Sequence, residues 1–374
     1  MGLIKIVRYN SQGEGVGYLD KKIAFVPFSA IGDMVIPTAI EEHKSFLRIL
    51  EYEIKKLARD RITPPCSHFT LCGGCQLQHL PYCKQLEIKK EIISNAFCKI
   101  AKLSLSMLPL EDVVPATKEL HYRHTAQFHC NATQVGMVSQ KSNQIIEVDN
   151  CLLLDKDLES ATTIIKKEIA TYKQKGLLVP PLFSISLTNE NKISISPSRN
   201  SYEDNLFNQV NRSTNALMQE FIFNTIKNSG NNNQSLLELF SGNGNFSLPL
   251  NKLFSNVVGI DYSKASIIKA NNQAKKMGLS HYRYIKMDCT KFLQKHKAYY
   301  DWVLLDPARA GMKDIKLISK NVNPQNIIYI SCNPTTLARD VKQLLECGYK
   351  LISIKPFDMF PQTYHVETVV LLSH

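Results

Sequence analysis

Short apolar runs alternate with amphipathic stretches through the second half of the chain. An amphipathic helix is predicted at residues 212–228, and strands at 236–240, 257–261, 282–287, 302–305, 327–330, 352–354 and 366–372. Short apolar runs bounded by polar residues are typical of buried strands. Strands that alternate with helices predict a right-handed, doubly wound parallel sheet, so residues 206–374 are expected to form an α/β domain.

The first 46 residues show a different pattern, in which short alternating runs follow one another closely. These runs lie at residues 3–7, 17–19, 23–26 and 33–37, with glycines and the pair Asp20-Lys21 between them. This spacing predicts a small β-barrel of the oligonucleotide-binding kind at residues 1–46.

Residues 47–205 are predicted to form a central α+β domain. Residues 44–60 fit either a helix or a linking strand, and a lysine-rich amphipathic helix is expected at 84–103. That helix is a candidate to pack on the third domain. Strands are expected at 134–138 and 145–148, a helix at 157–173 and a strand pair at 183–196.

Basic residues outnumber acidic ones, 45 to 33, which gives a formal net charge of +12. An excess of this size favours a polyanionic partner, RNA or DNA before a membrane surface, although it also serves general solubility. No stretch approaches the roughly 20 apolar residues that a membrane span needs, and the N-terminus lacks the apolar core of a signal peptide. We expect a cytoplasmic protein, in which ten cysteines favour metal, cluster or catalytic roles over disulfides.

Three cysteines lie close together in a glycine-containing loop with the spacing C-x5-C-x2-C, namely Cys66, Cys72 and Cys75. A zinc site needs four ligands, and three local cysteines with one remote cysteine is a common way to hold an iron–sulfur cluster. We favour Cys151 as the remote ligand because it follows a strand-like run, and the other candidates are Cys83, Cys98 and Cys130. The identity of the metal stays open at this point.

Another cysteine, Cys332, follows the apolar strand predicted at 327–330 and precedes an Asn333-Pro334 turn. Thr335 and Thr336 are fair N-caps for a helix that begins near Leu337. Helix N-termini lower the pKa of a thiol, and the thiolate is the reactive species. Cys332 is therefore a candidate nucleophile, and the alternative is a small buried apolar residue.

The carboxyl ends of the other predicted strands carry glycine or aspartate. Gly242 and Gly244 form a strand-to-helix turn, and the next three strands end at or just before Asp261, Asp288 and Asp306. This set suits S-adenosylmethionine, whose adenosine needs polar groups and whose sulfonium favours carboxylates. A dinucleotide oxidoreductase is disfavoured because Ser247 stands where a third glycine is usual. Each aspartate also fits a helix N-cap.

Four motifs together carry a resemblance to a known family. They are LFSGNGNF at 239–246, DPARAG at 306–311, SCNPTTLARD at 331–340 and HVETV at 365–369, and with them the chain resembles the RNA uracil-5-methyltransferases. GEGVG at 13–17 with VPF at 26–28 resembles the TRAM domain, an RNA-binding barrel. With the cysteine loop, the chain is most similar to the branch that acts on 23S ribosomal RNA, because the transfer-RNA branch usually lacks barrel and cluster.

The resemblance implies a Rossmann-like class I methyltransferase domain and a role for each matching residue. Cys332 would be the nucleophile and Glu367 the base. The residues that would contact S-adenosylmethionine are Gln209, Phe240, Asn245, Asp261, Asp288 and Asp306, and those that would hold a [4Fe-4S] cluster are Cys66, Cys72, Cys75 and Cys151. Three positions depart from the family pattern: Ser241 replaces a frequent cysteine, Asp261 a frequent glutamate and His124 a common arginine.

The expected function is S-adenosylmethionine-dependent methylation of C5 of an unpaired or flipped uridine. We expect this uridine to lie in 23S ribosomal RNA, and we expect no obligate protein partner. Transfer RNA is the alternative substrate. A non-catalytic RNA-binding or redox-sensing iron–sulfur protein is an alternative of another class. That alternative predicts no tight binding of S-adenosylmethionine and leaves the motif around Cys332 without a purpose.

Overall fold

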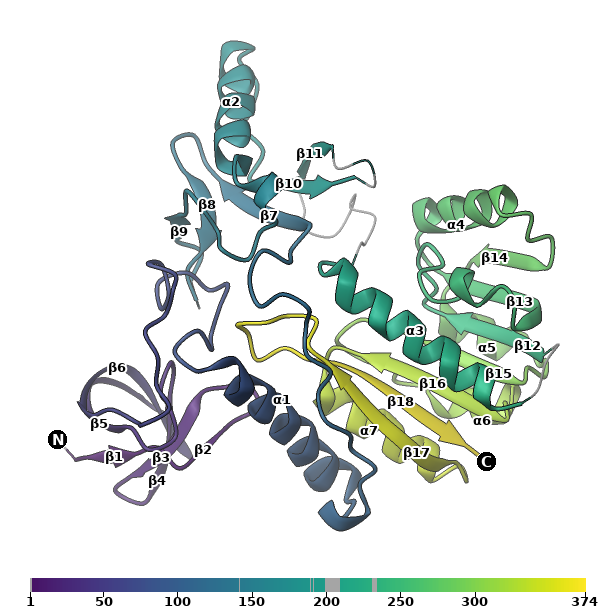
Figure 1. Cartoon of the computed structure of the whole chain (residues 1–374), viewed down its shortest axis with the longest axis horizontal. Coiled ribbons are helices and arrows are strands. Elements are labelled where there is room, and N and C mark those ends of the chain that lie inside the picture. The colour runs from purple at the N-terminus through teal and green to yellow at the C-terminus, as the bar shows by residue number, and fades with distance from the viewer. Residues whose placement is uncertain (1, 141, 189, 191, 199–208, 231–233) are drawn as a thin grey trace.

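A computed structural model of the chain describes residues 2–140, 142–188, 190, 192–198, 209–230 and 234–374 (Figure 1). Within these residues the strands form a six-stranded, a five-stranded and a seven-stranded sheet, in that order along the chain. No helix in this part of the chain is long and apolar enough to cross a membrane.

The six-stranded sheet occupies the N-terminus and has the order β1-β5-β6-β4-β3-β2. The two edge strands β1 and β2 are consecutive in the chain, with Ile6 and Val7 between them, so the first residues connect both edges of a curled sheet. The strands are β1 (Ile4–Lys5), β2 (Arg8–Tyr9), β3 (Gly15–Leu19), β4 (Lys22–Val26), β5 (Met34–Glu42) and β6 (Phe46–Lys56).

The long strand β6 settles the structure of residues 44–60, for which the sequence left a helix and a strand open. It pairs with β5 along most of its length and with β4 at its start. The sheet therefore extends to Lys56, beyond the predicted domain boundary at residue 46. The division of the chain at residues 46 and 205 stays a prediction.

The five-stranded sheet is antiparallel throughout, with the order β11-β10-β7-β8-β9. Helix α2 (Ala161–Gln174), which is preceded by a 3-10 turn at Lys156–Leu158, buries Ile165 and Ile169 against Phe128 and Phe183 of the sheet. Its strands are β7 (Thr125–Cys130), β8 (Val135–Val138), β9 (Ile145–Glu147), β10 (Leu182–Leu187) and β11 (Ile193–Ser198).

The seven-stranded sheet forms the C-terminal part and has the order β14-β13-β12-β15-β16-β18-β17. Strands β12 to β16 pair in parallel, whereas β18 is antiparallel to both β16 and β17. The strands are β12 (Gln234–Leu239), β13 (Phe254–Asp261), β14 (Tyr282–Lys286), β15 (Trp302–Leu305), β16 (Asn326–Ser331), β17 (Lys350–Phe357) and β18 (Glu367–Ser373).

The prediction of an entirely parallel sheet is therefore wrong at β18. Nine residues, 358–366, connect β17 to β18 and contain no helix. A parallel return needs a crossover of a dozen or more residues, so a connection of this length returns the chain antiparallel.

Apolar residues of the C-terminal sheet alternate between two cores, one on each face. Leu236 faces helices α3 (Arg212–Asn228) and α4 (Lys264–Lys276), and Leu237 faces the opposite core. That second core receives α5 (Cys289–Lys295), α6 (Lys316–Asn321) and α7 (Pro334–Leu345).

Helix α1 (Tyr82–Ala96) also enters this second core, although it comes from the stretch predicted as central. Ile93 and Ala96, with Phe97 of the following π-helical turn (Phe97–Ala101), pack among the residues beneath the C-terminal sheet. Figure 1 shows α1 running between the N-terminal sheet and the C-terminal domain. Helix α1 therefore joins the two.

Parallel strands end at the same edge of their sheet, so β12, β13, β15 and β16 bring their following residues together. The order of the strands reverses between β12 and β15, and open α/β sheets bind ligands in the crevice at such a point. The residues delivered there are Phe240, Asp261, Asp306 and Cys332.

Candidate active site

The turn after β12 has a backbone that few side chains tolerate. Gly242 and Gly244 have φ of 52° and 80°, and a Cβ on Gly244 would lie 2.8 Å from the Tyr284 hydroxyl. Phe240 has a φ of 59°, which is rare for a bulky residue. Such a backbone conformation persists only where the surrounding structure enforces it. The N–H of Phe240 donates to Cys289 Sγ at 3.2 Å. The turn therefore requires glycine at position 244, where the backbone packs closely against Tyr284 and Leu248.

Asp261 closes this turn from the end of β13. One carboxylate oxygen accepts the Gly242 N–H at 2.9 Å, and the other accepts the Ser263 N–H at 2.7 Å. Asp261 therefore ties the glycine turn to the start of α4. Each oxygen keeps a further lone pair for a ligand hydroxyl.

A buried acid lies beneath the turn, and sequence reasoning missed it. Glu238 of β12 is 1% exposed, and Ser247 donates a hydrogen bond to it while also contacting the Tyr284 hydroxyl at 2.7 Å. Burial raises the pKa of Glu238 to about 8, and the carboxylate of Asp306 adds to the rise. A glutamate inside an otherwise apolar strand was the signal that could have revealed it.

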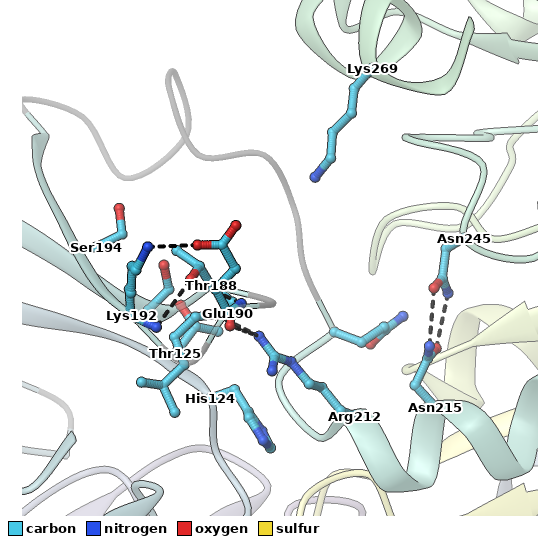
Figure 2. Close-up of a pocket in the computed structure, with 13 residues that line it drawn as sticks. His124, Thr125, Thr188, Glu190, Lys192, Ser194, Arg212, Asn215, Asn245 and Lys269 are labelled. Carbon is cyan, nitrogen blue, oxygen red and sulfur yellow. Dashed lines mark hydrogen bonds and ion pairs between the residues drawn. The ribbon is translucent and has the colours of Figure 1, made fainter. Parts of the chain in front are cut away.

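Asn245 and Gln209 lie on a cavity of about 650 Å³ between the central sheet and the C-terminal domain (Figure 2). The amide of Asn245 exchanges two hydrogen bonds, of 2.9 and 3.0 Å, with Asn215 of α3. Among the described residues that line this cavity are the basic side chains of Lys192, Arg212 and Lys269, but neither Cys332 nor Glu367.

Asp288 lies apart from this group in its contacts. It is exposed, and its carboxylate accepts the Lys291 N–H at 2.9 Å as the N-cap of α5. This is the helix N-cap role that the sequence left open for each aspartate. A contact between Asp288 and S-adenosylmethionine stays a prediction.

The pairing of β18 with β16 brings Cys332 to Glu367. Ser331 is directly opposite Thr368, so the next residue of each strand, Cys332 and Glu367, meet at the end of the ladder. Residues opposite each other in an antiparallel pair have Cα atoms about 4.5–5.5 Å apart. Glu367 is 7% exposed and Cys332 is half-buried, so a buried carboxyl lies beside a partly accessible thiol.

The environment of Cys332 raises the pKa of its thiol to about 11, contrary to the lowering expected from a helix N-terminus. Burial is the main cause and the charge of Glu367 adds to it, whereas the guanidinium of Arg309 acts in the opposite direction. Helix α7 begins at Pro334, and its cap is Asn333 rather than Thr335 or Thr336. The thiol is therefore protonated in the free protein at neutral pH.

Two neighbouring carboxyls share this site. Burial raises the pKa values of Glu367 and Asp306 well above their ordinary range, and the charge of Asp306 raises that of Glu367 further. Arg309 opposes the rise at Glu367. Like charges in a buried site cannot both ionise freely, so the pair retains a proton near neutral pH.

The loop that carries Asp306 and Arg309 is fixed by the start of α7. The carbonyl of Arg309 accepts hydrogen bonds from Asn333 Nδ2 and Thr336 Oγ1, both at 3.0 Å. Asp340 is fully buried and accepts the Met312 N–H at 2.8 Å and the Tyr329 hydroxyl at 2.7 Å. These contacts join the segment after β15 to β16 and to the start of α7.

The predicted cluster cysteines form a set of their own. Burial raises the pKa of Cys75 to about 12, and the charges of Cys151, Cys72 and Cys66 add to the rise. Cys72 Sγ accepts the Gly74 N–H at 3.4 Å, and the backbone of Cys72 forms an isolated antiparallel β-bridge with Ser139, just after β8. The charge of Cys151 acts on both Cys72 and Cys75, and its role as the remote cluster ligand stays a prediction.

This set does not amount to a site for a single ion. No group of three or more His, Cys, Asp or Glu residues in the described ranges could hold a metal ion. A [4Fe-4S] cube is wider than one ion, so its thiolates stand further apart. The structure therefore does not show a cluster, and the assignment of the four cysteines as its ligands stays a prediction.

The C-terminal part is a doubly wound α/β domain whose parallel strands end at a crevice of the kind that binds ligands in such sheets. The family model for tRNA (Uracil-5-)-methyltransferase matches residues 189–374. An uncharacterised RNA methyltransferase of Mycoplasma mobile is 32% identical over 99% of this chain and 97% of its own. The chain belongs to the RNA uracil-5-methyltransferase family.

Two further relatives differ in the RNA that their names specify. The 23S rRNA (uracil(1939)-C(5))-methyltransferase of Aliivibrio fischeri is 28% identical over 98% of this chain and 95% of its own. The Pyrococcus abyssi tRNA (uracil-54, C5)-methyltransferase, solved with S-adenosyl-L-homocysteine, superposes with a TM-score of 0.76 at 22% identity over 99% of this chain and 100% of its own. The latter likeness shows a shared fold.

Replacing Glu238 by glutamine should remove a pH-dependent loss of stability. The pKa of Glu238 is 4.5 in the unfolded chain and about 8 in the folded protein. Between these two pH values the unfolded chain has released a proton that the folded protein keeps. Stability therefore falls as pH rises through this window, by up to about 1.4 kcal/mol per pH unit. Urea unfolding of wild type and Glu238→Gln at pH 6, 7, 8 and 9 should show the variant gaining relative stability up to about pH 8.

The matched control is Glu220→Gln, which changes an exposed carboxylate on α3. Its unfolding midpoint should run parallel to that of the wild type across the series. Parallel curves for Glu238→Gln as well would contradict a buried, protonated Glu238.

Proposed function

We propose that this protein methylates C5 of a uridine in 23S ribosomal RNA, using S-adenosylmethionine and a covalent bond between Cys332 and uracil C6. The observation that carries the proposal is the register of β18 against β16, which sets a carboxyl beside a thiol at the ligand-binding edge of the sheet. Relatives named as 23S rRNA enzymes in Aliivibrio fischeri and Shewanella woodyi, which match 98% of the chain, favour that RNA. Transfer RNA is the second candidate, favoured by the family model and by the archaeal fold relative.

Uracil C5 is a weak nucleophile until a group adds to C6. When Cys332 Sγ bonds to C6, the electrons of the C5=C6 bond move toward C5 and O4 and make C5 a carbanion equivalent. The thiol must first lose its proton, which burial disfavours. Arg309 lowers the pKa of this thiol by hydrogen bonding and by its charge, so it is the group that favours the thiolate.

S-adenosylmethionine supplies an electrophilic methyl group when it is bound. The C5 carbanion forms the new C–C bond, and the electrons of the broken S–CH3 bond stay on the donor sulfur. Glu367 then takes the proton from C5, the C–H electrons restore the C5=C6 bond, and the C6–S bond breaks to release Cys332 as a thiolate. The buried setting makes the ionised Glu367 a stronger base than an exposed glutamate.

The methyl donor would occupy the crevice around the glycine turn. Asp261 would accept ribose hydroxyls with its remaining lone pairs, since its backbone contacts already fix its orientation. Phe240 would provide an apolar wall, and Asp306 would lie near the positive sulfonium. Asp288, Asn245 and Gln209 would complete the contacts.

RNA binding would extend over the rest of the chain. The net charge of +12 suits a polyanion. The curled N-terminal sheet carries the motif at residues 13–17 that resembles a TRAM domain. His124, in place of the arginine common at its position, faces the cavity between the central and C-terminal parts.

Purified protein should transfer labelled methyl groups from S-adenosylmethionine to unmodified 23S rRNA, yielding 5-methyluridine by nucleoside mass spectrometry. Cys332→Ala should lower the rate by at least about 10⁴-fold while it retains donor binding, because it removes the nucleophile.

Glu367→Gln should accumulate a methylated protein–RNA adduct that survives denaturation. Methyl transfer by Cys332→Ala, or no adduct with Glu367→Gln, would contradict the assigned roles, and labelling of transfer RNA alone would favour the second substrate.

The cysteine set would hold a [4Fe-4S] cluster through Cys66, Cys72, Cys75 and Cys151. The N–H of Gly74 already points at Cys72 Sγ, which is a contact that stabilises a thiolate. Charge-sharing with iron would also remove the cost of burying Cys75, whose thiol is otherwise held protonated.

Anaerobic purification should give a brown protein with about four iron atoms per chain, because four thiolates hold one such cluster. Cys151→Ala should lose most of the iron and the colour. Cys83→Ala is the matched control, since this cysteine is exposed, and it should retain both. Stoichiometric zinc in place of iron would overturn the assignment.

A further inference from the structure

Helix α1 holds the connection between β17 and β18, which leads directly to Glu367. Lys89 of α1 and Asp358 of this connection form an ion pair in which neither side chain has any solvent exposure. Lys89 also donates to the carbonyl of Phe360 at 3.0 Å. A charge pair buried this deeply is strongly destabilised if one partner is removed, so it fixes the start of the connection to the helix.

One turn earlier on the same face of α1, Gln85 holds the middle of the connection. Gln85 Nε2 donates to Gln362 Oε1 at 2.9 Å, and the Gln362 N–H donates back to Gln85 Oε1, also at 2.9 Å. Gln85 is 1% exposed and Gln362 5%, so water does not replace these bonds. Residues four apart on a helix face the same side, which lets Gln85 and Lys89 act on one loop.

Gln362 has a backbone that needs such support. Its φ of 71° lies in the left-handed region, which a residue with a Cβ adopts only under strain. Its carbonyl accepts the N–H groups of both Gln76 and Leu77 at 3.0 Å, immediately after the last cysteine of the loop. Hydrogen bonds from α1 on one side and from the segment after Cys75 on the other thus hold Gln362 in its strained backbone conformation.

The chain from Gln362 to Glu367 has little freedom left to absorb a displacement. Thr363 Oγ1 donates to the Phe360 carbonyl at 2.8 Å and accepts the His365 N–H at 3.2 Å. Tyr364 packs against a cluster that contains Leu77, Leu80 and Ile88, and thus against α1 again. A shift of Gln362 is therefore passed along a tight turn to the first residue of β18.

We propose that Gln85 is a positioning residue for Glu367, which acts through Gln362 to hold the carboxylate where it meets C5 of the substrate. This inference rests on the proposed function, in which Glu367 removes the C5 proton. Gln85 contacts neither the thiol nor the crevice. Its side-chain amide donates hydrogen bonds to the carbonyls of Leu77 and Leu80 and to Gln362 Oε1. A base displaced by about 1 Å can lose about 100-fold in rate, so the elimination step is the step that Gln85 controls.

The test is Gln85→Met, which keeps the length of the side chain and removes its hydrogen bonds to Leu77, Leu80 and Gln362. In single-turnover assays with 23S rRNA, elimination should slow by about 10- to 100-fold, and a denaturation-resistant, methylated protein–RNA adduct should build up. The KM values for RNA and S-adenosylmethionine should stay within about 3-fold, because the crevice is untouched.

Asn321→Ala is the control for a loss of stability alone. Asn321, the last residue of α6, donates an amide hydrogen bond to the carbonyl of Leu293 on α5 at 2.7 Å. This contact lies away from the connection between β17 and β18. This variant should lose stability without any adduct. Gln362→Gly serves as a second variant if Gln85→Met does not fold, because glycine relieves the strained φ and removes the hydrogen bond from Gln85 Nε2 to Gln362 Oε1, while the backbone N–H of residue 362 can still donate to Gln85. It should also build up adduct.

A fall in all rates without adduct in Gln85→Met or Gln362→Gly would mean a purely structural role and would overturn the inference. So would an elimination rate equal to that of the wild type. Failure of the proposed function is distinguishable, because the wild-type protein would then form no 5-methyluridine and Glu367→Gln no adduct.

Discussion

The antiparallel pairing of β18 with β16 is the interaction on which the rest of the site depends. Backbone hydrogen bonds from Asn326 to Ser331 set the register, and the register decides that Glu367 meets Cys332. A slip of one residue would turn the carboxyl to the other face of the sheet. Burial is the main cause of the raised pKa of both groups, and the charge of Glu367 adds to the rise at Cys332, whereas the charge of Asp306 adds to the rise at Glu367.

Two separate supports hold this pair from opposite sides. Asp340 and Asn333 fix the loop that carries Asp306 and Arg309, and α1 fixes the connection that precedes Glu367. Helix α1 also packs into the core beneath the C-terminal sheet. The segment between the cysteine loop and the central sheet therefore supports the candidate site from outside the C-terminal domain.

The sequence predicted features that depend on neighbouring residues. The strands, the glycine turn and the position of Asp261 followed from local pattern, and the family resemblance named Cys332 and Glu367. The sequence did not predict the fully buried ion pair Lys89–Asp358, because its partners are far apart in the chain. It also did not predict the raised pKa of Glu238, because that pKa depends on tertiary burial. The raised thiol pKa was missed for the same reason, because a helix N-terminus is a local effect and desolvation is not.

The central claim is that Cys332 and Glu367 act on one uracil, and RNA that carries 5-fluorouridine tests it most directly. Fluorine cannot leave C5 as a cation, so Glu367 has no proton to remove and the C6–S bond stays intact after methyl transfer. Mass spectrometry of wild-type protein with this RNA and S-adenosylmethionine should show an adduct that contains protein, RNA and one methyl group, with the cross-link on the peptide of Cys332. No adduct, or a cross-link through Cys289 or Cys347, would contradict the account.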